Sequence, residues 1–185
     1  MDLPPPRSGL LRHWDTLIGP GASRAEQALI LGAAVAGTIG VAAHAYLHNV
    51  GWTIWQWMIL VVLALDLFGG VVANGTGAAR RWYHRPGQTR RDHFLFVAVH
   101  LAQLVVFALA FPSTNWLTVI GAYAYLLLSA LAILAAPTEL QRPVSYLSYI
   151  GALGVALLFN APTGLEWFLP ILYFKLLVSH LGMAS

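Results

Sequence analysis

The sequence predicts an all-α, polytopic membrane protein: six transmembrane helices in one bundle, preceded by a short amphipathic surface helix. Of the 185 residues, 58% are hydrophobic and only 9% are charged, whereas an average soluble domain carries about 25% charged residues. So few charges cannot cover a globule with water-compatible surface, and lipid must therefore be the solvent for most of the chain. In addition, every Arg lies outside the long apolar segments.

The first segment, residues 1–22, is expected to be cytoplasmic and to contain a helix that lies on the membrane surface. Its apolar residues recur at helical spacing, namely Leu10, Leu11, Trp14, Leu17 and Ile18. This spacing is typical of an interfacial amphipathic helix, and a flexible tail is the alternative. A Gly-Pro-Gly break at 19–21 ends the segment, so residues 23–185 form the expected six-helix transmembrane domain.

Six apolar segments have about the length of 20 residues that a membrane-spanning helix needs. They cover residues 25–48, 53–77, 93–112, 115–136, 143–160 and 164–182. Turn-forming residues and the arginine-rich loop 78–92 separate them. Ser23 with Glu26, and Thr89 with Asp92, have the spacing of capping boxes at the start of the first and third helices.

Arginine placement predicts the orientation of the bundle. Arginines precede the first span and lie between the second and third and between the fourth and fifth, and the other loops contain none. The positive-inside rule therefore places both termini on the cytoplasmic side of a bacterial-type inner (plasma) membrane. The expected partners of the basic residues are anionic lipid headgroups rather than nucleic acid. The residues predicted to bind headgroups are Arg80, Arg81, His84, Arg85, Arg90 and Arg91; a topology signal with no specific ligand is the alternative.

Ionisable residues within the apolar segments predict a buried polar site in the inner half of the bilayer. Asp66, His100 and Lys175 reach overlapping depths on three helices, if each residue advances a helix by about 1.5 Å. A charge at the bilayer centre costs about 2.5–3.5 kcal/mol, so such residues are by default functional. The full predicted set is Asp66, Asn74, His100, Gln103, Lys175 and His180. The alternative is a purely structural Asp66–Lys175 ion pair.

A second polar cluster is expected at the outer side. His44 and His48 are four residues apart, so they share one helix face, and Glu166 begins the last span. Two such histidines and a carboxylate have the chemistry of a metal site. The alternative is that the histidines hydrogen-bond to water or to neighbouring carbonyls at the interface.

Three classes of function remain open. The favoured interpretation is a small transporter or channel for an ion or small solute, in which the buried polar site changes protonation. The alternative is a membrane-embedded enzyme, with or without a metal ion, that acts on a lipid or apolar substrate. A third is a pigment- or haem-binding or structural subunit of a membrane complex. The sequence assigns no catalytic residue and no cofactor beyond a possible metal ion. Small-residue faces predict a possible homodimer through Gly32, Gly40, Gly151 and Gly154.

Overall fold

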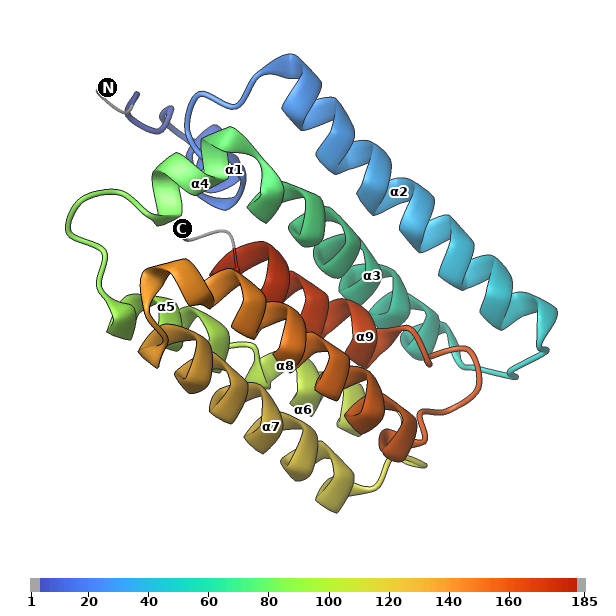
Figure 1. Cartoon of the computed structure of the whole chain (residues 1–185). Helices are drawn as coiled ribbons and strands as arrows, with labels where there is room; N and C mark the ends of the chain where they lie inside the picture. The colour runs from blue at the N-terminus through green and yellow to red at the C-terminus, as the bar shows by residue number, and fades with distance from the viewer. Residues whose placement is uncertain (1–3, 183–185) are drawn as a thin grey trace.

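The computed structural model describes residues 4–182, and every regular element within that range is a helix (Figure 1). Five helices are long and apolar enough to cross a membrane, which is the pattern of a multi-pass membrane protein. They are α2 (Arg24–Leu47), α3 (Ile54–Gly75), the pair α5 (Arg90–Ala98) and α6 (Leu101–Ala110), α7 (Trp116–Ala135) and α8 (Thr138–Phe159).

The sixth predicted span is not confirmed. The segment expected at 164–182 contains six residues of α-helix, α9 (Phe168–Tyr173), followed by eight of π-helix, η1 (Phe174–Leu181). At about 1.5 Å per residue this helix is about 20 Å long, which is short of the hydrocarbon thickness of about 30 Å. Instead it lies inside the bundle against α3, α7 and α8, and Lys175–Leu181 are all buried. Hydropathy predicted that this segment is apolar, but not that tight turns at 162–168 delay its helix.

The third predicted span, 93–112, is interrupted where α5 meets α6. The ring Nδ1 of His100 hydrogen-bonds to the Phe96 carbonyl at 2.7 Å, and the backbone N–H of His100 turns to Val97 instead. A side chain that competes for a helix carbonyl weakens the regular hydrogen-bond ladder. As a result, α6 packs against both α3 and α7, whereas α5 packs against α7. The α5 half of this span is therefore in less contact with α3 than the α6 half.

Two further elements differ from the prediction in where they begin. The loop expected at 78–92 contains a short helix, α4 (Gly77–Tyr83), whose first turn is capped by Thr76. Helix α8 begins at Thr138, five residues before the predicted position, and includes Pro143. Both capping boxes that the sequence predicted are present, at Ser23 and at Thr89.

The predicted N-terminal helix is confirmed as α1 (Leu10–Ile18), and it is attached to the bundle. The hydroxyl of Tyr83 donates to the carbonyl of Thr16 at 2.9 Å, and the indole of Trp14 donates to Gln27 at 3.2 Å. Ile18 is buried beside Ile30 and Ala73. Helix α1 thus covers one end of α2, α3 and α4, and its position at a membrane surface stays a prediction.

Gly19 allows this close approach. Its φ of +89° is a conformation that favours glycine, and a Cβ at this position would collide with the backbone of Ala78. The glycines proposed for dimerisation divide into two groups. Gly32, Gly40 and Gly154 face open space, while a Cβ at Gly151 would collide with the hydroxyl of Tyr125 between α7 and α8. Gly151 therefore serves internal packing rather than a dimer interface, and the homodimer remains a prediction.

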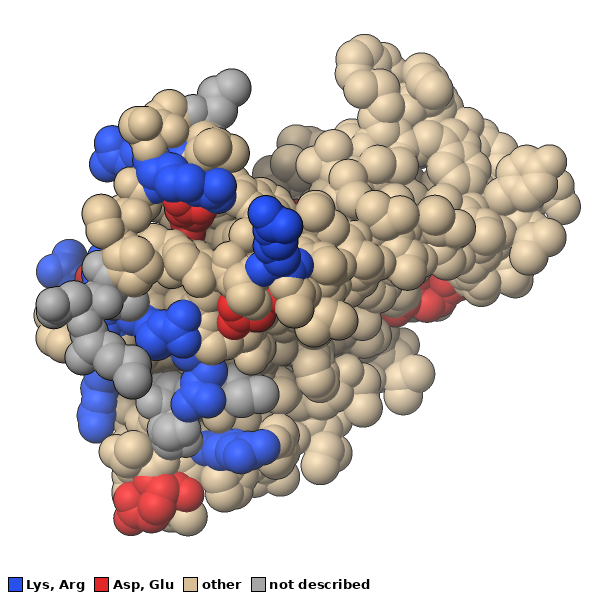
Figure 2. Space-filling view, turned by 90° about the horizontal axis from the view of Figure 1, so that it is seen from above, with Lys and Arg blue, Asp and Glu red and all other residues tan. Residues whose placement is uncertain are grey.

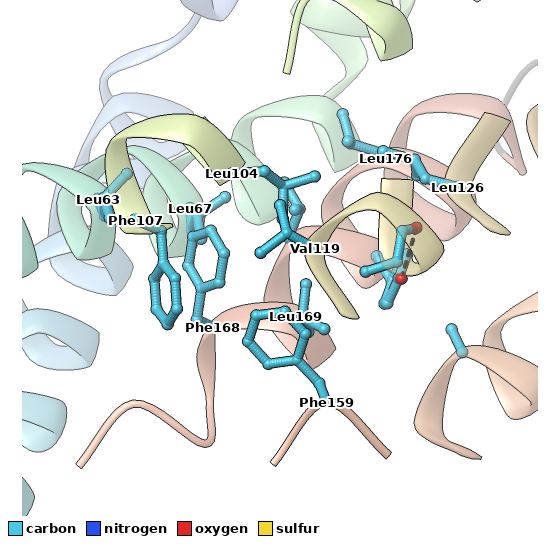
Figure 3. Packing of buried hydrophobic residues seen from close by; sticks show 14 of the residues in the cluster. Leu63, Leu67, Leu104, Phe107, Val119, Leu126, Phe159, Phe168, Leu169 and Leu176 are labelled. Atoms are coloured by element: carbon cyan, nitrogen blue, oxygen red, sulfur yellow. Dashed lines mark hydrogen bonds between the residues drawn. The ribbon is translucent and has the colours of Figure 1, made fainter. Parts of the chain in front are cut away.

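The core is aromatic and aliphatic and lies around the short central helix (Figure 3). Phe107 of α6 stacks on Phe168 of α9, with ring centroids 4.2 Å apart. Phe159 closes the cluster from the end of α8. Since lipid tails are as apolar as leucine, close packing of this kind is what holds membrane helices together.

We expect Gly19→Ala to lower the free energy of unfolding by at least about 1 kcal/mol, because it adds backbone strain and a backbone collision. Two controls separate the causes. Gly9→Ala has a φ of +68° but open space, so it adds strain alone, and Gly40→Ala adds neither. Denaturant titration of the detergent-solubilised variants measures the order of their stabilities. Equal stability of the Gly19 and Gly40 variants would contradict the packing of α1 described above.

Candidate polar site

The centre of the candidate site is an ion pair between two helices. The Nζ atom of Lys175 in η1 lies 2.6 Å from Oδ2 of Asp66 in α3. The two partners differ in exposure: the side chain of Lys175 is 6% exposed and that of Asp66 is 46% exposed. The predicted meeting of these two charges is therefore present, with the amine inside the protein and the carboxylate at a surface.

Gly70 makes room for the lysine. Its position on α3 is one turn from Asp66, and a Cβ there would overlap the Cε atom of Lys175. The alkyl chain of Lys175 therefore lies directly on the backbone of α3 before its ammonium reaches the carboxylate. Asn74, one further turn along, donates its amide to the backbone carbonyl of Lys175 at 3.3 Å.

Gln103 and His100 complete the predicted set on the α5–α6 side. The amide of Gln103 donates to the same Asp66 oxygen that Lys175 contacts. Its own Oε1 is buried and has no hydrogen-bond partner among residues 4–182. His100 is buried next to this group and lies on the wall of the same cavity. Five of the six residues predicted for the site are thus brought together.

A groove of about 600 Å³ opens beside the ion pair. We call it the α3 groove, because seven residues of α3 line it together with residues of α1, α2, α4, α5 and η1. Its polar lining consists of Asp66, Asn74, Tyr83, His100 and Lys175. The rest is apolar, and several apolar residues at its rim are on the bundle exterior: Leu31 is 50% exposed and Val62 is 64% exposed. In a membrane, such a rim faces lipid, so the groove opens toward the lipid.

His180 lies in a neighbouring cluster of histidines and is not among the residues that line the α3 groove. Its ring lies with those of His84 and His93, and the three ring centroids are 4.6–5.7 Å apart. The Nδ1 atom of His93 and the Nε2 atom of His180 are 3.3 Å apart. An α-helical register does not predict this position, because η1 has the wider hydrogen-bonding period of a π-helix. His93 was not predicted, although its spacing of seven residues from His100 could have indicated a shared face.

His84, predicted to bind headgroups, also turns inward. Its ring stacks on His93 with an interplanar angle of 22°. Burial, followed by repulsion from His93 and Arg80, lowers the pKa of His84 to about 4. A neutral, half-buried imidazole is a poor partner for a phosphate group, so the prediction of headgroup binding at this residue gains no support.

Figure 2 shows Lys and Arg side chains gathered toward one end of the molecule on the face drawn. Arg80, Arg81, Arg90 and Arg91 are exposed. Arg85 instead lies over the ring of Trp82 at 4.1 Å and donates to its carbonyl. Headgroup binding by the exposed arginines stays a prediction.

The cluster of His44, His48 and Glu166 that was predicted at the outer side is present as a set of polar contacts. His44 Nε2 lies 3.4 Å from Glu166 Oε2, and Nδ1 of His48 is 2.9 Å from the backbone carbonyl of His44. Among residues 4–182, no group of three histidines or carboxylates is arranged to hold a metal ion. The geometry therefore fits the alternative of interfacial hydrogen bonding, and the metal prediction gains no support.

No family model, no curated protein and no solved structure matches this chain.

Removing one charge of the ion pair should lower the free energy of unfolding, whereas removing both charges should lower it much less. We expect Asp66→Ala to destabilise the protein by about 3 kcal/mol, because it leaves the buried Lys175 charge without a partner. The double variant Asp66→Asn with Lys175→Met should recover most of that loss. The exposed His44–Glu166 pair is the matched control: Glu166→Gln should cost less than about 1 kcal/mol. Unfolding of the purified variants in detergent measures all three, and a double variant less stable than Asp66→Ala would contradict the assignment.

The inward position of His84 predicts an acid sensitivity. The pKa of His84 is about 4 in the folded protein, below its ordinary value of about 6.5. Between these two pH values His84 is protonated in the unfolded chain and neutral in the folded protein. Stability is therefore fully present above the ordinary histidine pKa of about 6.5 and is lost as the pH falls towards 4. We expect His84→Gln to flatten this decline in melting temperature, whereas removal of the exposed His13 should leave it unchanged. The same slope in His84→Gln and in the parent would exclude this cause.

Proposed function

We propose that this protein binds an amphipathic, lipid-like molecule in the α3 groove, with the polar end of that molecule at Asp66. One observation carries the proposal: a half-exposed carboxylate lies in the wall of a mostly apolar groove of about 600 Å³. This volume lies within the range of about 300–1,000 Å³ that is typical of small-molecule sites. A few placed polar groups in an apolar lining are also typical of them.

The shape of the groove favours a ligand with a chain. Along α3 the lining runs from Val62 to Asn74, which is about 18 Å at 1.5 Å per residue. Trp14, Leu17 and Ile18 of α1 cover one end of it. Since the rim residues Leu31 and Val62 face outward, a ligand can enter from the bilayer without crossing water.

Polar recognition must supply much of the selectivity. An apolar chain leaves lipid for a lining that is equally apolar, so burial of hydrocarbon contributes little. Hydrogen bonds to an acceptor in a low-dielectric site are correspondingly stronger. The proposal therefore assigns the central role to Asp66, which Lys175 and Gln103 hold in place.

A second candidate is transport of an ion or small solute. It is favoured by the pairing of a half-exposed Asp66 with a buried Lys175, because an acid–base pair inside a membrane can exchange a proton with a passing solute. Both functions fit a bundle whose arginine-rich end faces the cytoplasm of a bacterial-type inner membrane. Proteoliposome flux that depends on Asp66 would favour transport over binding.

Photolabelling tests the binding function directly. We use two C16 probes with a diazirine in the chain, one ending in a hydroxyl and one in a sulfate. Labelling by either probe should concentrate on Ile30–Ala34 and Val62–Ala73, because these segments line the groove. Leu65→Trp should reduce this labelling at least threefold by filling the groove. Leu128→Trp, on the exposed side of α7, is the control. Labelling spread evenly over all lipid-facing helices and unchanged by Leu65→Trp would overturn the proposal.

A further inference from the structure

We infer that the α3 groove selects an amphiphile whose polar end donates hydrogen bonds, such as a long-chain alcohol or amine, over one with an anionic headgroup. This inference rests on the proposed function and adds the chemical class of the ligand. It depends on which polar atoms around Asp66 are already paired and which are not.

The free oxygen of Asp66 is the first acceptor. Lys175 and Gln103 both contact Oδ2, and no residue within 4–182 donates to Oδ1. The Asp66 side chain is 46% exposed and lines the groove, so a ligand in the groove can reach the carboxylate. A carboxylate oxygen only accepts hydrogen bonds when ionised, so the group that meets it must donate.

His100 contributes a second acceptor. Its Nδ1 lies 2.7 Å from the Phe96 carbonyl, which can only accept, so Nδ1 carries the hydrogen. In the neutral ring, Nε2 is then an acceptor, and it has no partner among the residues described. His100 lines the same groove as Asp66. A hydroxyl or amino group between them can donate to either.

Gln103 indicates the same deficit of donors. Its Oε1 is buried without a partner in the described part of the chain, while its amide is engaged with Asp66. An unsatisfied buried acceptor is unfavourable and requires an explanation such as a missing water or ligand. Among the described residues, Oδ1 of Asp66 on α3 and Nε2 of His100 between α5 and α6 thus lack donors in the groove lining, and Oε1 of Gln103 on α6 lacks one next to it.

The charged donor in the groove lining is already engaged with Asp66. Lys175 lies along Gly70 with 6% of its side chain exposed, and its ammonium is directed at Oδ2 of Asp66. An anionic headgroup entering the groove would meet the exposed carboxylate before it met the ammonium. Like charges placed together in this way are costly and exclude wrong partners. The arrangement thus disfavours sulfate and phosphate groups at this depth.

Competition against the photoprobes tests this inference. Four unlabelled competitors share one C16 chain: hexadecan-1-ol, hexadecylamine, hexadecyl sulfate and methyl hexadecanoate. The alcohol and the amine donate hydrogen bonds, the sulfate is anionic, and the ester is neutral without a donor. We expect the alcohol and amine to compete at concentrations at least about tenfold lower, because a hydrogen bond to a charged acceptor changes affinity by about that factor or more.

The double variant Asp66→Asn with Lys175→Met keeps the region neutral, so it should fold and accept all four competitors with little preference. Glu139→Gln, which removes an exposed carboxylate at the start of α8, should keep the parental order. If the sulfate or the ester competes as well as the alcohol while groove labelling persists, the donor inference is wrong and binding stands. If neither probe labels the groove, the proposed function itself fails.

Discussion

The neutralisation of one lysine constrains the whole arrangement. Lys175 is buried on a helix surrounded by α3, α7 and α8, where an isolated ammonium would be several kcal/mol too costly. Its partner must therefore come from a neighbouring helix at the same depth, and Asp66 is that partner at 2.6 Å. Gly70 follows from this requirement, because only a residue without a Cβ lets the lysine chain reach the carboxylate along the backbone of α3.

Two irregular helices then decide what surrounds the pair. The π-helical turns of η1 put Lys175 and His180 one wide turn apart, so that the amine faces Asp66 and the imidazole faces His93. Around the interruption at His100, α5 is in less contact with α3 than α6 is. Two departures from ideal helices thus contribute residues to the candidate site, Lys175 from η1 and His100 from the α5–α6 junction.

The sequence predicted which intramembrane charges need a partner, and the structure shows which residues pair with them. The meeting of Asp66, Gln103 and Lys175 was predictable, because intramembrane charges need partners and depth can be counted along a helix. The length of the last helix was not, since apolar composition does not distinguish a full span from a buried short helix. The positions of His84 and His180 were also not predicted. The position of His84 depends on a loop that folds inward, and that of His180 depends on the π-helical register of η1. Neither leaves a periodic signal in the sequence.

The unequal exposure of the two charges argues against a purely structural ion pair. The desolvation cost of a buried structural pair is repaid only when both groups are fully hydrogen-bonded, and apolar residues of similar volume often serve a fold as well or better. Here the amine is enclosed, whereas the carboxylate remains half-exposed and no donor within residues 4–182 contacts its Oδ1. Lys175 therefore pairs with an acid that stays accessible at the groove wall. An acid kept accessible in apolar surroundings is suited to meet a polar group that arrives through the bilayer.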